Sequence, residues 1–255
     1  MKLTTFEMSI FLYAYTLSEA PHDLEDLTGV EGRNLFMVTV GEVSAVVSAY
    51  GQQTLTLAGD DIFAHQHVQR LLMSQSSIIP LQYGLTLSSL SQVEKVLKNN
   101  QEDLLKELHR VYRKVEMEVT MRFDVPDLLD HLIEKYPYLR DEKGKVLNGR
   151  LLYFLGDRAK KCEKFTRTLA KEKEIYKTQL EEMIGPWCAE IRESRLPRSE
   201  EDVVTFNCLV NRERLRVFEK SIYDAGERFS PHFTFAYNGP WAPQNFCSPS
   251  QISYQ

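Results

Sequence analysis

The stretch from residue 149 to 184 constrains the fold most, because after Gly149 it contains no proline and one glycine, Gly156. A seam of mostly apolar or small residues recurs there in steps of four and three: Leu155, Ala159, Cys162, Thr166, Leu169, Lys173, Tyr176, Leu180 and Met183. A period of about 3.5 residues is typical of a helix that packs against another helix. Such a helix would extend about 50 Å at 1.5 Å per residue, more than a compact domain needs. We therefore predict a long, coiled-coil-like helix over about 149–184, part of whose face meets another helix, another domain or a partner.

The first half of the chain mixes strand and helix patterns. Strand patterns cover residues 8–17, 35–40, 43–48, 78–83 and 115–123, and helix patterns cover 60–75 and 89–112. Ser89 and Gln92 predict a capping box at the start of the second helix. Gly41-Glu42 joins two of the strands as a type II′ hairpin turn would, and Pro80 places its strand at a sheet edge or bulge because proline lacks the ladder donor. Residues 115–123 alternate apolar and polar side chains, which predicts a strand with one wet face. We predict a ferredoxin-like α+β domain over residues 1–124.

The second half predicts another α+β domain, over residues 125–240 and built around the long helix. Gly185-Pro186 ends or kinks that helix, and a shorter helix is expected over 187–195. A strand, a helix and a strand then follow over 203–210, 215–229 and 233–237. A Pro-rich C-terminal tail without periodicity covers 241–255.

Charge and composition exclude several classes of protein. The 255 residues carry a formal net charge of −5, with 10 basic and 16 acidic side chains in residues 1–124 and 21 and 20 in residues 125–255. Neither half has the positive excess that phosphate-backbone binding uses, so we expect no nucleic-acid partner. The cysteines lie far apart without a C-x-x-C pair, which indicates a reducing compartment. No apolar run approaches the roughly 20 residues of a membrane span, so we expect a cytoplasmic, soluble protein.

No residue pattern predicts catalysis, a metal site or a bound cofactor. On a helix, His65 and His67 point in different directions and cannot easily share one ion. The acidic run Asp23, Glu25 and Asp26 is best explained as a solvated turn, and Asp60-Asp61 as a helix cap. Gly-rich phosphate motifs and a nucleophile elbow are absent from the sequence.

The long helix also carries a basic stripe: Arg158, Lys160, Lys161, Lys164, Arg167, Lys171, Lys173 and Lys177. Glu163, Glu172 and Glu174 interrupt it, which favours a solvated helix face that pairs with itself. The functional alternative is an acidic protein surface. The acidic first half, or that of a neighbouring copy through self-association, is one candidate for that surface.

An ordered set of segments remains that core packing does not explain. These are Phe11-Leu-Tyr-Ala-Tyr15, Val40-Gly-Glu-Val-Ser-Ala-Val-Val47, Ile79-Pro-Leu-Gln-Tyr-Gly84, Lys114-Val-Glu-Met-Glu-Val119, Gly149-Arg150, Phe218 and Tyr237-Asn-Gly-Pro-Trp-Ala-Pro243. In this order they resemble the gas vesicle protein F/L family over nearly the whole chain. The family usually ends this motif with Gly-Pro-Trp-Pro-Pro-Tyr and has Arg-Phe where this chain has Gln82-Tyr83; here Ala242 and Gln244 replace the second Pro and the Tyr.

The resemblance implies a component of gas vesicles, the gas-filled protein shells that give some aquatic prokaryotes buoyancy. It implies a non-enzymatic structural or accessory protein, located at the gas vesicle within the cytoplasm. Its partners would be the hydrophobic shell protein and other gas vesicle proteins during assembly. Two other functions stay open: a cytoplasmic enzyme with a spatially assembled site, and a nucleic-acid-binding protein that uses the basic helix.

A companion of a strongly apolar shell protein should offer it apolar surface or a strand edge. The candidate partner-binding residues are Pro80 and Tyr83 in the proline-bearing segment, and Trp241 and Phe246 in the tail. Aromatic side chains next to proline are rigid anchors. The alternative is that Trp241 and Phe246 fold back and cover the gap between the two domains.

Overall fold

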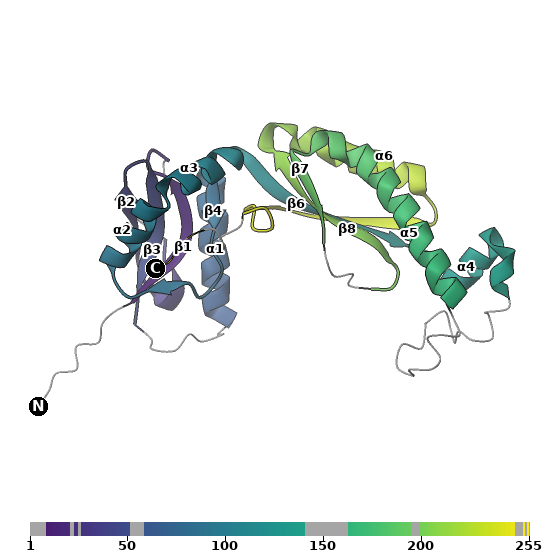
Figure 1. The fold of residues 1–255 in the computed structure, drawn as a ribbon, viewed down its shortest axis with the longest axis horizontal. Coiled ribbons are helices and arrows are strands. Elements are labelled where there is room, and N and C mark those ends of the chain that lie inside the picture. Colours follow the sequence, from purple (N-terminus) through teal and green to yellow (C-terminus); the bar gives the residue numbers. More distant parts are fainter. Residues whose placement is uncertain are drawn as a thin grey trace, which may run out of the picture. The chain divides into compact units, whose positions relative to one another are not determined.

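The computed structural model describes residues 9–20, 23–24, 27–51, 59–140, 163–194, 199–247, 252 and 254. It contains two β-sheets with packed helices, which confirms the predicted α+β class (Figure 1). The chain divides into two compact units, residues 1–116 with 240–255 (unit 1) and residues 117–239 (unit 2). The boundary falls within strand β6 (Lys114–Phe123), so unit 1 is built from both ends of the sequence.

Unit 1 begins with a sheet that helices cover on both faces. In chain order its elements are β1 (Ser9–Leu17), the short 3₁₀ helix η1 (Val30–Gly32), β2 (Leu35–Val40), β3 (Val43–Tyr50), α1 (Gly59–Gln75), β4 (Ile78–Pro80), β5 (Thr86–Leu87), α2 (Leu90–Asn99) and α3 (Gln101–Arg110). The strand order is β2-β3-β1-β4, with antiparallel pairs throughout. Strands β4 and β5 pair with opposite ends of β1 and form one interrupted edge.

Burial on both faces explains the composition of β1, which is a nearly continuous apolar and aromatic run. On one face Leu12 packs with residues of α2 and α3 such as Val96 and Leu104. On the other face Phe11 and Tyr13 meet His65 of α1, with ring centroids 5.6 and 5.5 Å apart.

Local signals in unit 1 are confirmed in two places and corrected in two. Strands β2 and β3 form the predicted hairpin, and Gly41 adopts φ +59° at its turn. Ser89 caps α2 by accepting a hydrogen bond from the backbone N–H of Gln92. The single helix predicted over 89–112 is two helices, because Asn100 leaves the helical conformation and its side chain donates to the carbonyl of Val96. Helix α1 begins at Gly59, so Asp60 and Asp61 lie in its first turn rather than at its cap.

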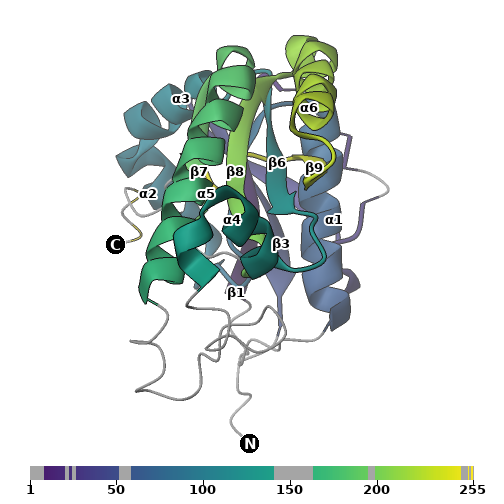
Figure 2. The same cartoon turned by 90° about the vertical axis from the view of Figure 1, so that its right-hand side faces the viewer.

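Unit 2 consists of a four-stranded sheet and its helices. Its elements are β6, α4 (Leu128–Lys135), α5 (Glu163–Ile184), the 3₁₀ helix η4 (Gly185–Trp187), β7 (Glu190–Glu193), β8 (Asp202–Asn211), the 3₁₀ helix η5 (Arg212–Arg214), α6 (Leu215–Phe229) and β9 (Phe233–Trp241). The strand order is β7-β8-β6-β9, and helices α5 and α6 lie side by side over one face (Figure 2).

Contacts along β6 show that its neighbours run antiparallel to it. Thr120 and Arg122 of β6 bond Thr205 and Asp202 of β8, so the partner numbers fall as the β6 numbers rise. On the other side, Glu118 bonds Asn238, while Asp124 bonds the backbone of His232. Among the described residues, the α-helices α4 and α5 lie between β6 and β7, and α6 lies between β8 and β9, which gives the β-α-β-β-α-β order of a split βαβ unit.

Three predictions about the fold need correction. Residues 115–123 form a strand of the second sheet, not the first, because alternation identifies the face that meets a core but not which core. The ferredoxin-like detail predicted for residues 1–124 is not confirmed, since that unit has the order β-β-β-α-β-β-α-α. The helix expected over 187–195 is wrong: residues 190–193 form β7, paired with β8.

The described part of the long helix, α5, packs within its own unit. It contacts β8 and α6, and its buried side chains are Phe165, Thr168, Leu169, Glu172, Leu180 and Ile184. The seam residues Leu155, Ala159 and Cys162 lie outside the described residues. The coiled-coil character predicted for 149–184 is therefore not confirmed.

Candidate functional site

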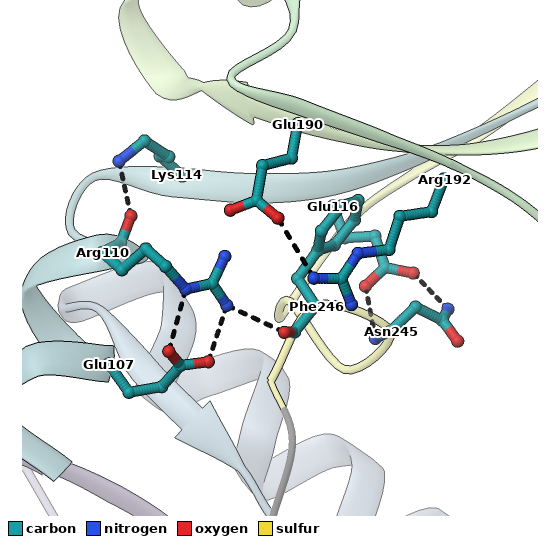
Figure 3. Close-up of polar contacts among 8 residues, drawn as sticks. All are labelled: Glu107, Arg110, Lys114, Glu116, Glu190, Arg192, Asn245 and Phe246. Carbon is teal, nitrogen blue, oxygen red and sulfur yellow. Dashed lines mark hydrogen bonds and ion pairs between the residues drawn. The ribbon is translucent and has the colours of Figure 1, made fainter. Parts of the chain in front are cut away.

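The predicted tail begins with a segment that is anchored on unit 1 by Arg110. The guanidinium of Arg110 donates to the backbone carbonyl of Phe246 at 2.8 Å and to both carboxylate oxygens of Glu107 at 2.8 and 2.6 Å (Figure 3). Lys114 donates to the carbonyl of Arg110. The fork of Arg110 thus ties helix α3 to a residue 136 positions later in the sequence.

Glu116 provides the second anchor of the segment. Its carboxylate accepts hydrogen bonds from the backbone N–H of Asn245, at 2.8 Å, and from the Asn245 side-chain amide (Figure 3). These bonds correct the prediction of a wet face on residues 115–123, since Glu116, Glu118 and Thr120 are 1%, 7% and 7% exposed. Charged side chains can be buried there because partners satisfy them.

Apolar contacts complete the docking of this segment. Phe246 is 1% exposed, and Cys247 packs in the same core cluster as β1, β3, α2 and α3. Burial raises the pKa of the Cys247 thiol, which stays protonated. Further along, Ile252 and Tyr254 pack against the same core.

The structure separates the two aromatic residues predicted in the tail. Trp241 ends β9 and is 45% exposed, whereas Phe246 is buried in unit 1. The side chain of Phe246 is thus covered by its own chain. Trp241 keeps an exposed indole next to Pro240.

Pro80 and Tyr83 lie at the interrupted edge of the first sheet. Pro80 pairs with Ala14 at the end of β4, which confirms the edge position, and its side chain is buried. Tyr83 is half-buried and its ring lies 5.7 Å from Phe11 and 5.6 Å from His65. Of the predicted partner-binding residues, Trp241 is thus the most exposed.

His65 is a buried residue of unit 1. Its Nε2 faces the carbonyl of Leu81 at 3.0 Å, and its ring lies among aromatic side chains. Burial lowers its pKa to about 4, so the ring is neutral at neutral pH. The described ranges bring no three His, Cys, Asp or Glu side chains together as a metal-binding group.

Three of the described residues of the basic stripe have partners. Arg167 bonds Glu163, Lys173 donates to the carbonyl of Glu200, and Lys177 bonds Glu193. On the inner side, buried Glu172 accepts from Lys135 at 2.7 Å and from the hydroxyl of Tyr136. Arg158, Lys160 and Lys161 lie outside the described residues, as do Glu25 and Asp26.

Residues 9–248, nearly the whole chain, match the family described as gas vesicle synthesis protein GvpL/GvpF. The chain belongs to this family. Two solved GvpL/GvpF-type structures share its fold: the gas vesicle protein GvpF from Anabaena sp. PCC7120, and GvpF from Microcystis aeruginosa. The Anabaena structure has a TM-score of 0.77 at 16% identity, and the match covers 94% of this chain and 96% of that one. The Microcystis structure has a TM-score of 0.75 at 18% identity, and the match covers 93% of this chain and 98% of that one. A comparison with curated protein sequences finds no match.

Two features of this GvpL/GvpF chain were not predicted from its sequence. The docking of the tail through Arg110 and Glu116 depends on residues more than 100 positions apart, which no local pattern reports. Strand β9 extends to Trp241, beyond the predicted end at residue 237. Its nine residues contain no charge, and this feature of the sequence could have indicated an uncharged sheet edge. Within the described residues, no helix is both long and apolar enough to cross a membrane.

Proposed function

We propose that this chain is a non-enzymatic accessory protein of the gas vesicle, where it contacts the hydrophobic shell protein and helps the shell to assemble. The observation that carries the proposal is the family match over residues 9–248. The fold shared with two GvpF structures over more than 90% of both chains supports it. The pairing of Arg167, Lys173 and Lys177 on α5 favours this function over nucleic-acid binding.

Trp241 is the residue of this chain that we propose as the contact with the shell protein. Its indole combines a large apolar surface with one polar N–H, and few rotatable bonds are lost on binding. Neighbouring Pro240 restricts the backbone further. The docking of residues 243–247 on unit 1 limits how far Trp241 can move, because Asn245 and Phe246 are held by hydrogen bonds.

A single substitution tests this contact. Trp241→Ala should reduce the amount of purified shell protein captured by the tagged chain by about tenfold or more, as for a tryptophan hot spot. Tyr112→Ala is the matched control, since Tyr112 is 53% exposed and lies on unit 1 between α3 and β6. Equal capture by wild type and Trp241→Ala, with unchanged melting temperatures, would remove Trp241 from the proposal.

Association with the vesicle is tested separately. Antibody against the chain should label purified, washed gas vesicles, either before or after their collapse. Labelling of intact vesicles indicates the outer surface, and labelling only after collapse indicates the inner surface. Two results together would contradict the proposed function. The chain would be found entirely in the wash, and cells that lack it would still produce vesicles normally.

A further inference from the structure

The outer edge of strand β9 has the features of an interface. Strand β9 stands at the end of the order β7-β8-β6-β9, and among the described strands β6 is its one neighbour. All its residues except Phe233 and Phe235 are exposed. An edge strand presents backbone N–H and C=O groups that can pair with another strand, and proteins normally protect such edges with charges.

The two edges of this sheet are protected very differently. Strand β7 is four residues long and carries Glu190, Arg192 and Glu193. Strand β9 has nine residues, none of them charged. Pro240 removes one backbone donor near the end of β9. Residues 233–239 all retain their backbone N–H groups, so the rest of the edge is not protected in this way.

The register of β9 against β6 identifies the backbone groups that point outward. The carbonyl of His232 accepts from the N–H of Asp124, so residue 232 directs its backbone toward β6. Because the direction alternates along an antiparallel strand, residues 234, 236 and 238 also face β6. The backbone groups of Phe233, Phe235 and Tyr237 then point away from the sheet.

The side chains of these three residues share one face, the face that α6 covers. Phe233 and Phe235 contact Phe229 of α6, and Tyr237 contacts Tyr223 with ring centroids 6.5 Å apart. Thr234 and Ala236 lie on the opposite face and are exposed. The outer edge thus combines outward backbone groups with a row of aromatic side chains.

We propose that two copies of this chain pair through β9, antiparallel and centred on Phe235, to join their second sheets into one. In an antiparallel pair centred on Phe235, each other residue lies opposite the residue equally far on the other side of the centre, and because β9 carries no charge, no like charges meet across the pair. Phe235 opposes its counterpart in the second copy, and Phe233 opposes Tyr237. These aromatic cross-strand pairs favour association. Thr234 then opposes Ala236 of the second copy.

The Thr234–Ala236 pairing provides a test specific to this register. The double variant Thr234→Lys with Ala236→Lys places like charges opposite each other twice. The double variant Thr234→Glu with Ala236→Lys places opposite charges there and is the matched control. Both sites are exposed and the backbone is unchanged, so both variants should melt close to wild type.

Sedimentation velocity over a concentration series measures the result. Wild type should move from 29.6 kDa toward twice that mass as its concentration rises. The Lys/Lys variant should weaken this association by about tenfold or more, and the Glu/Lys variant should restore it. Hydrogen exchange should show the amides of Phe235 and Tyr237 becoming protected with concentration in wild type and Glu/Lys, but not in Lys/Lys. A wild type that keeps the single-chain mass throughout, or a dimer equally stable in both variants, would overturn the proposal.

Discussion

The backbone N–H of Asn245 donates a hydrogen bond to the carboxylate of Glu116, which lies 129 residues earlier in the sequence and is 1% exposed. We expect Glu116→Ala to lower the free energy of unfolding by about 1–3 kcal/mol, because the Asn245 donors lose their acceptor. Glu116→Gln keeps one acceptor oxygen and should cost less. Urea denaturation followed by circular dichroism measures both, and equal losses for the two variants would contradict the hydrogen-bond explanation.

The two tail aromatics should differ in their effect on stability. Phe246→Ala removes a ring that is 1% exposed, and should cost about 3 kcal/mol or more through lost burial and the cavity left behind. Trp241→Ala removes a ring that is 45% exposed, and should cost under about 1 kcal/mol. Thermal melting of both variants checks the difference. Similar losses would show that Trp241 is packed as firmly as Phe246.

His65 should make unit 1 less stable in mild acid. Burial lowers its folded-state pKa to about 4, whereas the unfolded value is 6.5, so the unfolded chain binds the proton first. Its contribution is complete above pH 6.5 and is lost as the pH falls toward 4, by ~3 kcal/mol in total. His65→Phe should flatten the pH dependence of the urea midpoint between pH 6.5 and 4. An unchanged slope would assign the acid sensitivity to other groups.

Two ion pairs on helix α5 should differ in strength because one carboxylate is buried. In the Lys135–Glu172 pair Glu172 is 1% exposed, whereas Arg167 and Glu163 are 79% and 70% exposed. Lys135→Met should cost about 1–3 kcal/mol, since it leaves the buried carboxylate with one fewer charged donor. Arg167→Ala should cost about 0.5 kcal/mol or less. Urea denaturation of both variants, followed by the fluorescence of unit 2, compares their free energies of unfolding. Similar losses of stability would count against burial as the cause.

Local chemistry was predicted well because its causes lie within a few residues. Gly41 supplies the positive φ of the hairpin, and the Ser89 hydroxyl meets an N–H three residues later. Pro80 indicates a strand edge because it removes a donor. Each of these signals acts through the backbone of its own segment, so no knowledge of the tertiary fold is needed.

Long-range pairing was not predictable in the same way. The alternation over residues 115–123 is equally compatible with either sheet, and the partner of β6 became evident only from Thr120 facing Thr205. The burial of Glu116 depends on Asn245, and that of Glu172 on Lys135. A charged residue is predicted to be exposed unless its partner is known. For the same reason Phe246 was grouped with Trp241, although its side chain is buried.

The composition of unit 1 from residues 1–116 and 240–255 bears on synthesis as well as on structure. A ribosome delivers the strands of the first sheet early, but residues that complete its core, such as Cys247, come after the whole of unit 2. During translation the first unit therefore has an incomplete core until the C-terminal residues emerge, whereas unit 2 can fold once its own residues have been synthesised. Chains released before residue 247 lack this final packing, and cellular proteases that recognise exposed apolar surface would select against them.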